Sequence, residues 1–141
     1  MVGMVDGHNR VISIQPAHDP SGAPGGAVAR ALLSQIAEAV DVYIHHYIPE
    51  IIDIGALGLS APERAILDQA LGKGEISVEI TVAGGSQIEE TQFAGVWRVR
   101  HYGEGGALQT EWIEITDVPE IIKSDVADMA AGLKSLRESW A

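Results

Sequence analysis

The chain has no cysteine, few basic residues and no long hydrophobic run. The absence of cysteine excludes disulfide bonds, thiolate zinc sites, iron–sulfur ligation by cysteine and cysteine nucleophiles. With 9 Lys and Arg against 20 Asp and Glu, the formal net charge is -11, and the field of the chain repels nucleic acid and anionic lipid. No apolar run approaches a membrane span or a signal-peptide core. We therefore expect a cytoplasmic protein that binds neither nucleic acid nor membranes.

The remaining composition is that of one folded domain. The chain has 141 residues, of which 46% are hydrophobic, and this is enough for one modest core. Residues 1–26 are rich in glycine and proline and include "DPSGAPGG", which predicts a flexible N-terminal arm. We expect residues 27–141 to form a single domain.

Two helices and a short strand are predicted in the first half of this domain. Apolar residues recur at spacings of three and four from Ala27 to His46, which indicates a helix. The β-branched run "EIIDI" (50–54) predicts a short strand. Ser60 and Glu63 have the spacing of a capping box, and Gly72 stands where the second helix should end.

The second half changes to an alternating pattern. Apolar and polar residues alternate over 75–82, and two more strands are expected at "VWRVRHY" and "LQTEWIEI". A strand over 87–93 has a broken alternation, which indicates a bulge. The predicted fold is α+β: an antiparallel sheet of three or four strands, packed with two helices of the N-terminal half and a long C-terminal helix.

The C-terminal helix is predicted over residues 118–140 and is amphipathic. Its large apolar residues recur at spacings of four and three, a seam typical of coiled coils. One interpretation is that this helix lies on its own sheet. The other is that it pairs with a second chain in a homodimer, which makes these residues a candidate oligomer seam: Ile122, Val126, Met129, Leu133, Leu136 and Trp140.

The segment "VWRVRHY" gathers scarce positive charge beside aromatic residues. Successive side chains of a strand face opposite sides, so Arg98 and Arg100 share one face. If this strand pairs with the next, the two arginines can meet Glu111 or Glu114, depending on the register. A charged ladder on the solvent face is therefore one interpretation.

In that interpretation Trp97 and Val99 belong to the core, and His101 is a hydrogen-bonded residue at the edge. The alternative is a recognition face, because arginine and aromatic side chains are enriched at protein-binding hot spots. The candidate partner-binding residues are Phe93, Trp97, Arg98, Arg100, His101 and Tyr102.

Evidence in the sequence for metal binding or catalysis is weak. Glu38, Asp41 and His45 share a helix side and are weak candidates for divalent metal ligands, and His8 and His18 lie in the predicted arm. No metal motif, nucleophile motif or phosphate-binding loop is present. We therefore predict no metal, no cofactor and no enzyme activity.

Three blocks resemble a known family. The segments "IDIGALGLSAPERAILDQALGKGEISVEI" (52–80), "TQFAGVWRVRHY" (91–102) and "IEITDVPEII" (113–122) are similar to the C-terminal conserved region of the bacterial HupH/HyaF hydrogenase expression proteins. Family blocks of the form "LSPxER", "LGxGEV" and "FPGVWWVRH" differ here at Ala61, Ile76, Ala94 and Arg98.

The resemblance implies a chaperone-like accessory protein for maturation of uptake nickel–iron hydrogenase, and it implies no catalytic residue. The expected partners are the large-subunit precursor or other hydrogenase maturation proteins. A metal-handling protein that carries nickel or iron is the alternative.

Overall fold

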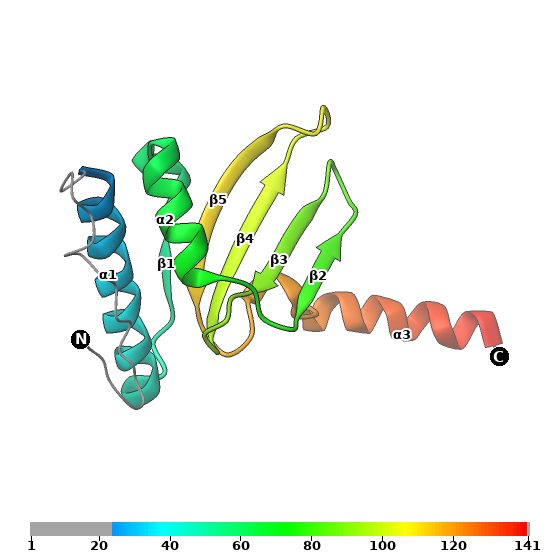
Figure 1. Cartoon of the computed structure of the whole chain (residues 1–141). Coiled ribbons are helices and arrows are strands. Elements are labelled where there is room, and N and C mark those ends of the chain that lie inside the picture. The colour runs from blue at the N-terminus through cyan, green and yellow to red at the C-terminus, as the bar shows by residue number, and fades with distance from the viewer. Residues whose placement is uncertain (1–23, 141) are drawn as a thin grey trace.

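The computed structural model describes residues 24–140, which form a five-stranded antiparallel sheet and three α-helices (Figure 1). The predicted α+β class is confirmed. Residues 1–23 of the predicted arm lie outside the described residues, and its last three residues begin the first helix. In chain order the elements are α1 (Pro24–His46), β1 (Glu50–Ile52), η2 (Gly55–Leu57), α2 (Ala61–Leu71), β2 (Ser77–Ile80), β3 (Ser86–Glu90), β4 (Val96–Tyr102), β5 (Leu108–Ile115), η3 (Glu120–Ile122) and α3 (Val126–Trp140).

The strands are arranged in the order β1-β5-β4-β3-β2, and every neighbouring pair is antiparallel. The predicted count of three or four strands is too low, because β1 joins the sheet at its edge. Glu50 pairs with Ile115 and Ile52 pairs with Ile113. The β-branched run predicted the strand itself, but its place in the sheet depends on a partner far along the chain and leaves no local signal.

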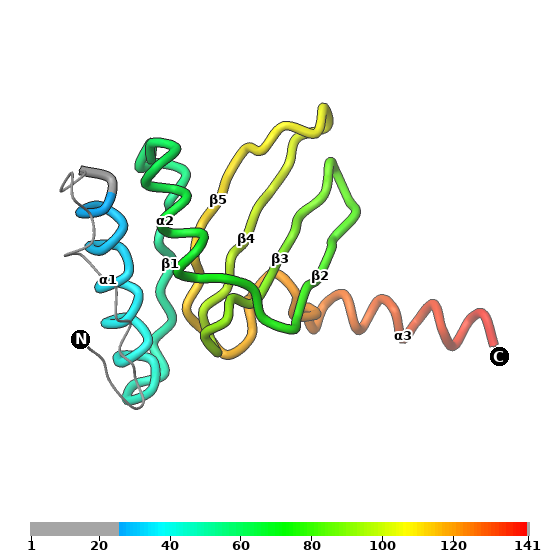
Figure 2. The backbone as a smooth tube through the Cα atoms, viewed as in Figure 1, coloured from blue at the N-terminus to red at the C-terminus, as the bar shows by residue number. Residues whose placement is uncertain are grey.

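Helices α1 and α2 lie together on one face of the sheet (Figure 2). The two helices meet the β1, β4 and β5 side of that face, where apolar side chains from all five elements form the main core. Its buried members are Leu32, Leu33, Ile36, Ala39, Ile52, Ile54, Leu67, Leu71, Val96, Ile113 and Ile115. The apolar stripe predicted for the first helix therefore supplies one wall of the core.

Helix α2 has the N-terminal capping box that its sequence predicts. The amide of Glu63 donates to Ser60 Oγ over 3.3 Å, and the amide of Ser60 donates to Glu63 Oε1 over 2.7 Å. Gly72 follows the helix with φ 59°, a conformation that glycine adopts without strain. These local contacts fix where α2 begins and ends above the sheet.

The opposite face of the sheet holds a smaller apolar cluster. Ile88, Trp97 and Val99 are buried there, and the indole nitrogen of Trp97 donates to the carbonyl oxygen of Thr116 over 3.1 Å. Ile122 from η3 packs against the same cluster. The segment after β5 therefore closes part of this face.

The bulge predicted in the strand over 87–93 is absent, because β3 ends at Glu90 and Phe93 lies in the turn that follows. In that turn the amide of Thr91 donates to the carbonyl of Val96 over 2.9 Å. The register shift occurs instead where β4 pairs with β5: His101 pairs with Thr110 and Tyr102 pairs with Leu108, so the extra residue, Gln109, lies on β5.

The predicted C-terminal helix over 118–140 is divided into two parts. Lys123 is extended after η3, and α3 begins at Val126. Figure 1 shows α3 pointing away from the sheet, and none of its residues is buried. The expectation that this helix lies on its own sheet is therefore wrong. The described segment that packs on the apolar cluster of the free face is η3, through Ile122.

Candidate functional site

The six residues predicted to bind a partner do not form one exposed surface. Arg98 and Arg100 face α2, whereas Trp97 and His101 face the opposite side of the sheet. Only 4% of Trp97 and 8% of Arg98 is exposed. Phe93, in the preceding turn, is half-buried against the main core. The strand is therefore mainly a structural element, with two differently built faces.

On the α2 face, the carboxylate of Glu111 is the centre of an ion cluster. Arg64 from α2 makes a two-pronged contact with it, with Nη2 2.7 Å from Oε1 and Nη1 3.2 Å from Oε2. Arg100 Nε donates to Glu111 Oε2 over 2.9 Å. Of the two predicted partners for the arginines, Glu111 is the one that the register selects, because Glu114 faces the other side.

A second part of the cluster connects Arg98 to α2. Arg98 Nη2 lies 2.8 Å from Asp68 Oδ1, but the N–H is not aligned with the oxygen, so the contact is an ion pair without a hydrogen bond. Arg100 Nη1 also lies 3.7 Å from Glu89. Three guanidinium groups thus face three carboxylates: Arg64, Arg98 and Arg100 against Asp68, Glu89 and Glu111. The exposed Lys73 also lies 3.6 Å from Glu89.

The ion cluster changes the pKa of its central carboxyl. Burial by itself would raise the pKa of Glu111, but the hydrogen bonds from Arg64 and Arg100 outweigh it, and the pKa lies below its ordinary value of 4.5. The same contact with Glu111 raises the pKa of Arg64.

The charged ladder predicted for the solvent face is in fact a largely buried cluster beneath α2. Sequence reasoning missed Arg64 and Asp68 because they belong to another element.

On the opposite face, His101 forms a hydrogen bond through Nδ1 to the hydroxyl of Ser86, and its ring lies 4.8 Å from that of Trp112. Tyr102 is half-buried at the end of the strand and helps to line a depression of about 460 Å³ near the β2–β3 turn. The expectation that His101 is hydrogen-bonded is confirmed, but its place at the edge is wrong, because β4 is an inner strand of the sheet. The predicted burial of Trp97 and Val99 is confirmed.

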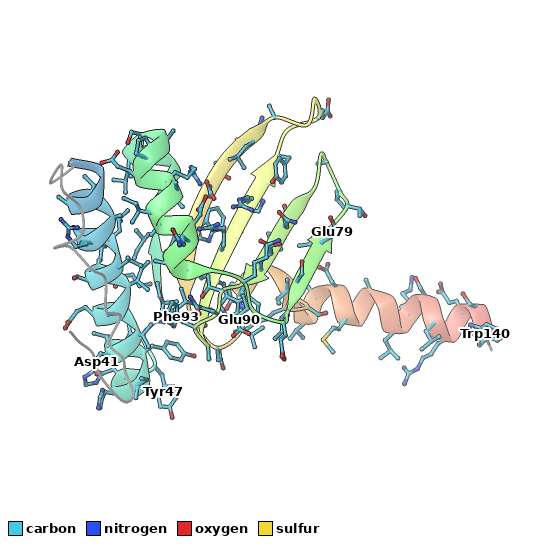
Figure 3. The ribbon with its side chains drawn as sticks, in the orientation of Figure 1. Asp41, Tyr47, Glu79, Glu90, Phe93 and Trp140 are labelled. Carbon is cyan, nitrogen blue, oxygen red and sulfur yellow. The ribbon has the colours of Figure 1, made fainter. Side chains whose placement is uncertain are left out.

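Four large apolar side chains are exposed between the end of α1 and β1. Ile44, Tyr47, Ile48 and Ile51 are each 57–77% exposed, and we call them the α1–β1 patch. Tyr47 has φ 57°, which is strained for a residue with a side chain. Figure 3 labels Tyr47 at the end of α1, near Asp41.

Sequence reasoning missed this patch, although a signal was present. Ile44 and Ile48 do not fit the apolar stripe that α1 buries, so they had no predicted place in the core. A depression of about 310 Å³ adjoins the patch, and it is lined by Pro49, Glu50, Ile51, Glu114, Thr116 and Glu120. Its rim is therefore acidic.

The residues of the predicted oligomer seam are divided between η3 and α3. Ile122 is half-buried in the small cluster and belongs to η3, so it lies outside α3. The other five members are on α3 and are 46–83% exposed: Val126, Met129, Leu133, Leu136 and Trp140. Each is free to contact a partner.

The weak metal candidates are all on α1 and exposed. His45 Nδ1 lies 2.9 Å from the carbonyl oxygen of Asp41 and 3.4 Å from its carboxylate. Within residues 24–140 no three His, Asp or Glu side chains are grouped so that they could hold a metal ion. His8 and His18 lie outside the described residues.

No helix in the described part of the chain is long and apolar enough to cross a membrane.

Comparison with known proteins gives consistent matches. A family model described as "HupH hydrogenase expression protein, C-terminal conserved region" matches residues 27–141. The hydrogenase expression/formation protein HoxQ of Azotobacter vinelandii is 31% identical over 74% of this chain and 36% of its own length. HupQ of Azotobacter chroococcum mcd 1 is 28% identical over 79% of this chain and 41% of its own length.

A solved structure has the same fold. The hydrogenase expression protein HupH from Thiobacillus denitrificans ATCC 25259 is 38% identical and matches with a TM-score of 0.75, over 79% of this chain and 93% of that chain. The present chain spans less than half the length of these two curated relatives. Because the family model covers most of the chain, the protein belongs to the family defined by the C-terminal conserved region of the HupH hydrogenase expression protein.

Proposed function

We propose that this protein is an accessory factor for the expression or maturation of a nickel–iron hydrogenase, and that it acts by binding the large-subunit precursor or another maturation protein. The observation that carries this proposal is the family match over residues 27–141. The solved relative, which covers the same fold at 38% identity, is named a hydrogenase expression protein. The site of action that we predict is the cytoplasm.

We propose binding rather than catalysis because the arginines beneath α2 and the carboxylates that face them are occupied with one another. The carboxylate of Glu111 is 1% exposed and is held by Arg64 and Arg100. A catalytic acid or base needs access to a substrate proton. The ion cluster therefore fixes α2 to the sheet and leaves recognition to other surfaces.

The contact surface that we propose is the α1–β1 patch. Large apolar side chains that stay exposed on a folded body commonly mark a protein-binding surface. Glu50 and Glu120 lie at the rim of the adjoining depression, and the chain as a whole is strongly acidic. The patch therefore fits a segment that presents apolar side chains next to lysine or arginine.

Four of the six predicted partner-binding residues keep part of their surface accessible: Phe93, Arg100, His101 and Tyr102. Because Arg100 and His101 face opposite sides of the sheet, these residues remain candidates for separate contacts and not for one surface. Charge reversal at Arg98 and Arg100 is a poor test of these contacts. It would place two more carboxylates against Asp68 and Glu111, so the fold as well as binding would be affected.

The test is affinity purification of the tagged protein from its own host under hydrogenase-inducing conditions, with identification of the copurifying proteins by mass spectrometry. We expect enrichment of a hydrogenase subunit or a hydrogenase maturation protein. Ile44→Glu should remove that enrichment, because it places a charge in the patch without disturbing the core.

Ser34→Glu is the matched control, since it adds the same charge at an exposed position of α1 outside the patch. It should retain the partner. If no hydrogenase-related protein is enriched by the unmodified chain, the proposed role is wrong. If the partner is retained by the Ile44 variant, the role stands and the patch is the wrong surface.

A further inference from the structure

Helix α3 presents an apolar seam that nothing in the described chain covers. Its large side chains recur at spacings of three, four, three and four, so they lie on one side of the helix. They are 46–83% exposed: Val126, Met129, Leu133, Leu136 and Trp140. Contiguous apolar surface of this kind is rare on a monomer and usually marks an interface.

The body of the protein is a poor partner for this seam. The apolar cluster on the free face of the sheet is already closed, with Ile88 and Val99 fully buried and Trp97 at 4% exposure. Figure 3 shows Trp140 at the far end of α3, remote from the sheet. The occupant must therefore come from outside the folded body.

Gly132 indicates that the occupant approaches the backbone closely. A Cβ atom at this position would meet nothing within 4 Å in the chain itself. A glycine inside a helix costs about 1 kcal/mol relative to alanine, so the isolated chain gives no reason for it. Gly132 and Ala130 flank Leu133 on the two sides of the seam, where small residues allow a second helix to pack closely.

The charges of α3 favour a second, antiparallel copy of the same helix. Asp125 and Asp128 lie at its start, whereas Lys134 and Arg137 lie in its second half, where Glu138 is 3.6 Å from Lys134. An antiparallel pair brings the acidic end of each helix to the basic half of the other. A parallel pair would bring like charges together, and it would also align the two helix dipoles unfavourably.

We propose that α3 pairs with α3 of a second copy of this chain in an antiparallel homodimer, with the seam buried and Leu133 near its centre. The two bodies then lie at opposite ends of the helix pair, so their α1–β1 patches stay accessible. A stable protein interface usually covers about 800 Å² on each partner, and a pair of helices of this length is at the small end of that class. We therefore expect a dissociation constant in the micromolar range. This proposal does not rest on the proposed hydrogenase role.

Sedimentation equilibrium of the full chain over a range of concentrations tests the dimer. The mass should rise to twice that of the 14.9 kDa chain. Leu133→Glu should raise the dissociation constant by about a hundredfold or more, because it places a carboxylate in the centre of the seam. Ala131→Glu, which adds the same charge on the opposite side of the helix, should leave the dimer intact. Both positions are exposed, so neither change disturbs the fold.

Two further variants test the packing and the direction of the helices. Gly132→Ala should weaken the dimer by about tenfold even though it favours the helix. The chain has no cysteine, so each introduced cysteine is the only one in its variant. The Val126→Cys and Trp140→Cys proteins can therefore be mixed and oxidised. If the helices are antiparallel, we expect a disulfide bond between one variant and the other. Linkage of Val126→Cys only to itself would overturn the antiparallel arrangement.

A monomer at all concentrations, or equal weakening by Leu133→Glu and Ala131→Glu, would overturn the dimer.

Discussion

Glu111 shows how one side chain connects the stability of this fold to pH. It is buried at the centre of β5, beneath α2, and two guanidinium groups hold its carboxylate. The pKa of this carboxyl in the folded chain lies below 4.5, so the unfolded chain binds its proton more readily. Its contribution to stability is therefore complete above the unfolded pKa and is lost as the pH falls towards the folded pKa.

We predict that Glu111→Gln lowers the free energy of unfolding at neutral pH by about 3 kcal/mol, because Arg64 and Arg100 then share no buried carboxylate. The variant should also lose less stability than the unmodified chain when the pH falls below about 5. Urea unfolding at a series of pH values measures both effects.

Glu79→Gln is the matched control for that experiment, since Glu79 is exposed on the same face of the sheet. It should change neither the unfolding free energy nor the pH slope by more than about 0.5 kcal/mol. An unchanged pH slope in the Glu111 variant would show that this carboxyl does not carry the acid sensitivity.

Among the elements, the helices and strands with local signals were predicted, whereas the pairings between distant segments were not. Ser60 and Glu63 specify the start of α2 within one turn, and the alternation in β2 needs only its own residues. The pairing of β1 and the placement of Arg98 beneath Asp68 both depend on segments far along the chain. The periodicity of the C-terminal segment was visible, but the break at Lys123 was not, because η3 keeps the same apolar spacing.

The turn between β2 and β3 makes a testable close contact. A Cβ atom at Gly84 would lie 2.5 Å from the carbonyl oxygens of Tyr102 and Gly103, and Gly84 has φ 90°. We predict that Gly84→Ala lowers the free energy of unfolding by about 2 kcal/mol or more, because both the space and the backbone conformation are unsuitable. Thermal unfolding followed by circular dichroism measures the change.

Gly105→Ala is the control for this substitution, because a Cβ atom at Gly105 meets nothing within 4 Å. Its unfolding midpoint should stay close to that of the unmodified chain. Equal effects at the two glycines would mean that the contact between the two turns is not tight in solution.

For the molecule as a whole, α3 is an appendage rather than part of the core. None of its residues is buried, so a chain that ends at Ile122 should keep the sheet, α1 and α2 intact. We predict that its unfolding free energy in dilute solution matches that of the full chain within about 0.5 kcal/mol. Urea unfolding with intrinsic tryptophan fluorescence measures this, because Trp97 and Trp112 remain in the body.

Concentration distinguishes this expectation from a structural role of α3. The midpoint of the full chain should rise with protein concentration, since association stabilises the folded form, whereas that of the shortened chain should not. A shortened chain that is less stable at every concentration would contradict the view of α3 as an appendage.

The two outer strands of the sheet are its shortest, with three residues in β1 and four in β2. An open strand edge is a template on which identical chains stack into fibres, and short, charged edges suppress this. Glu50 lies on β1 and Glu79 on β2, so copies that meet edge to edge bring like charges together. Short edges that carry a charge of the same sign therefore disfavour edge-to-edge growth of the sheet.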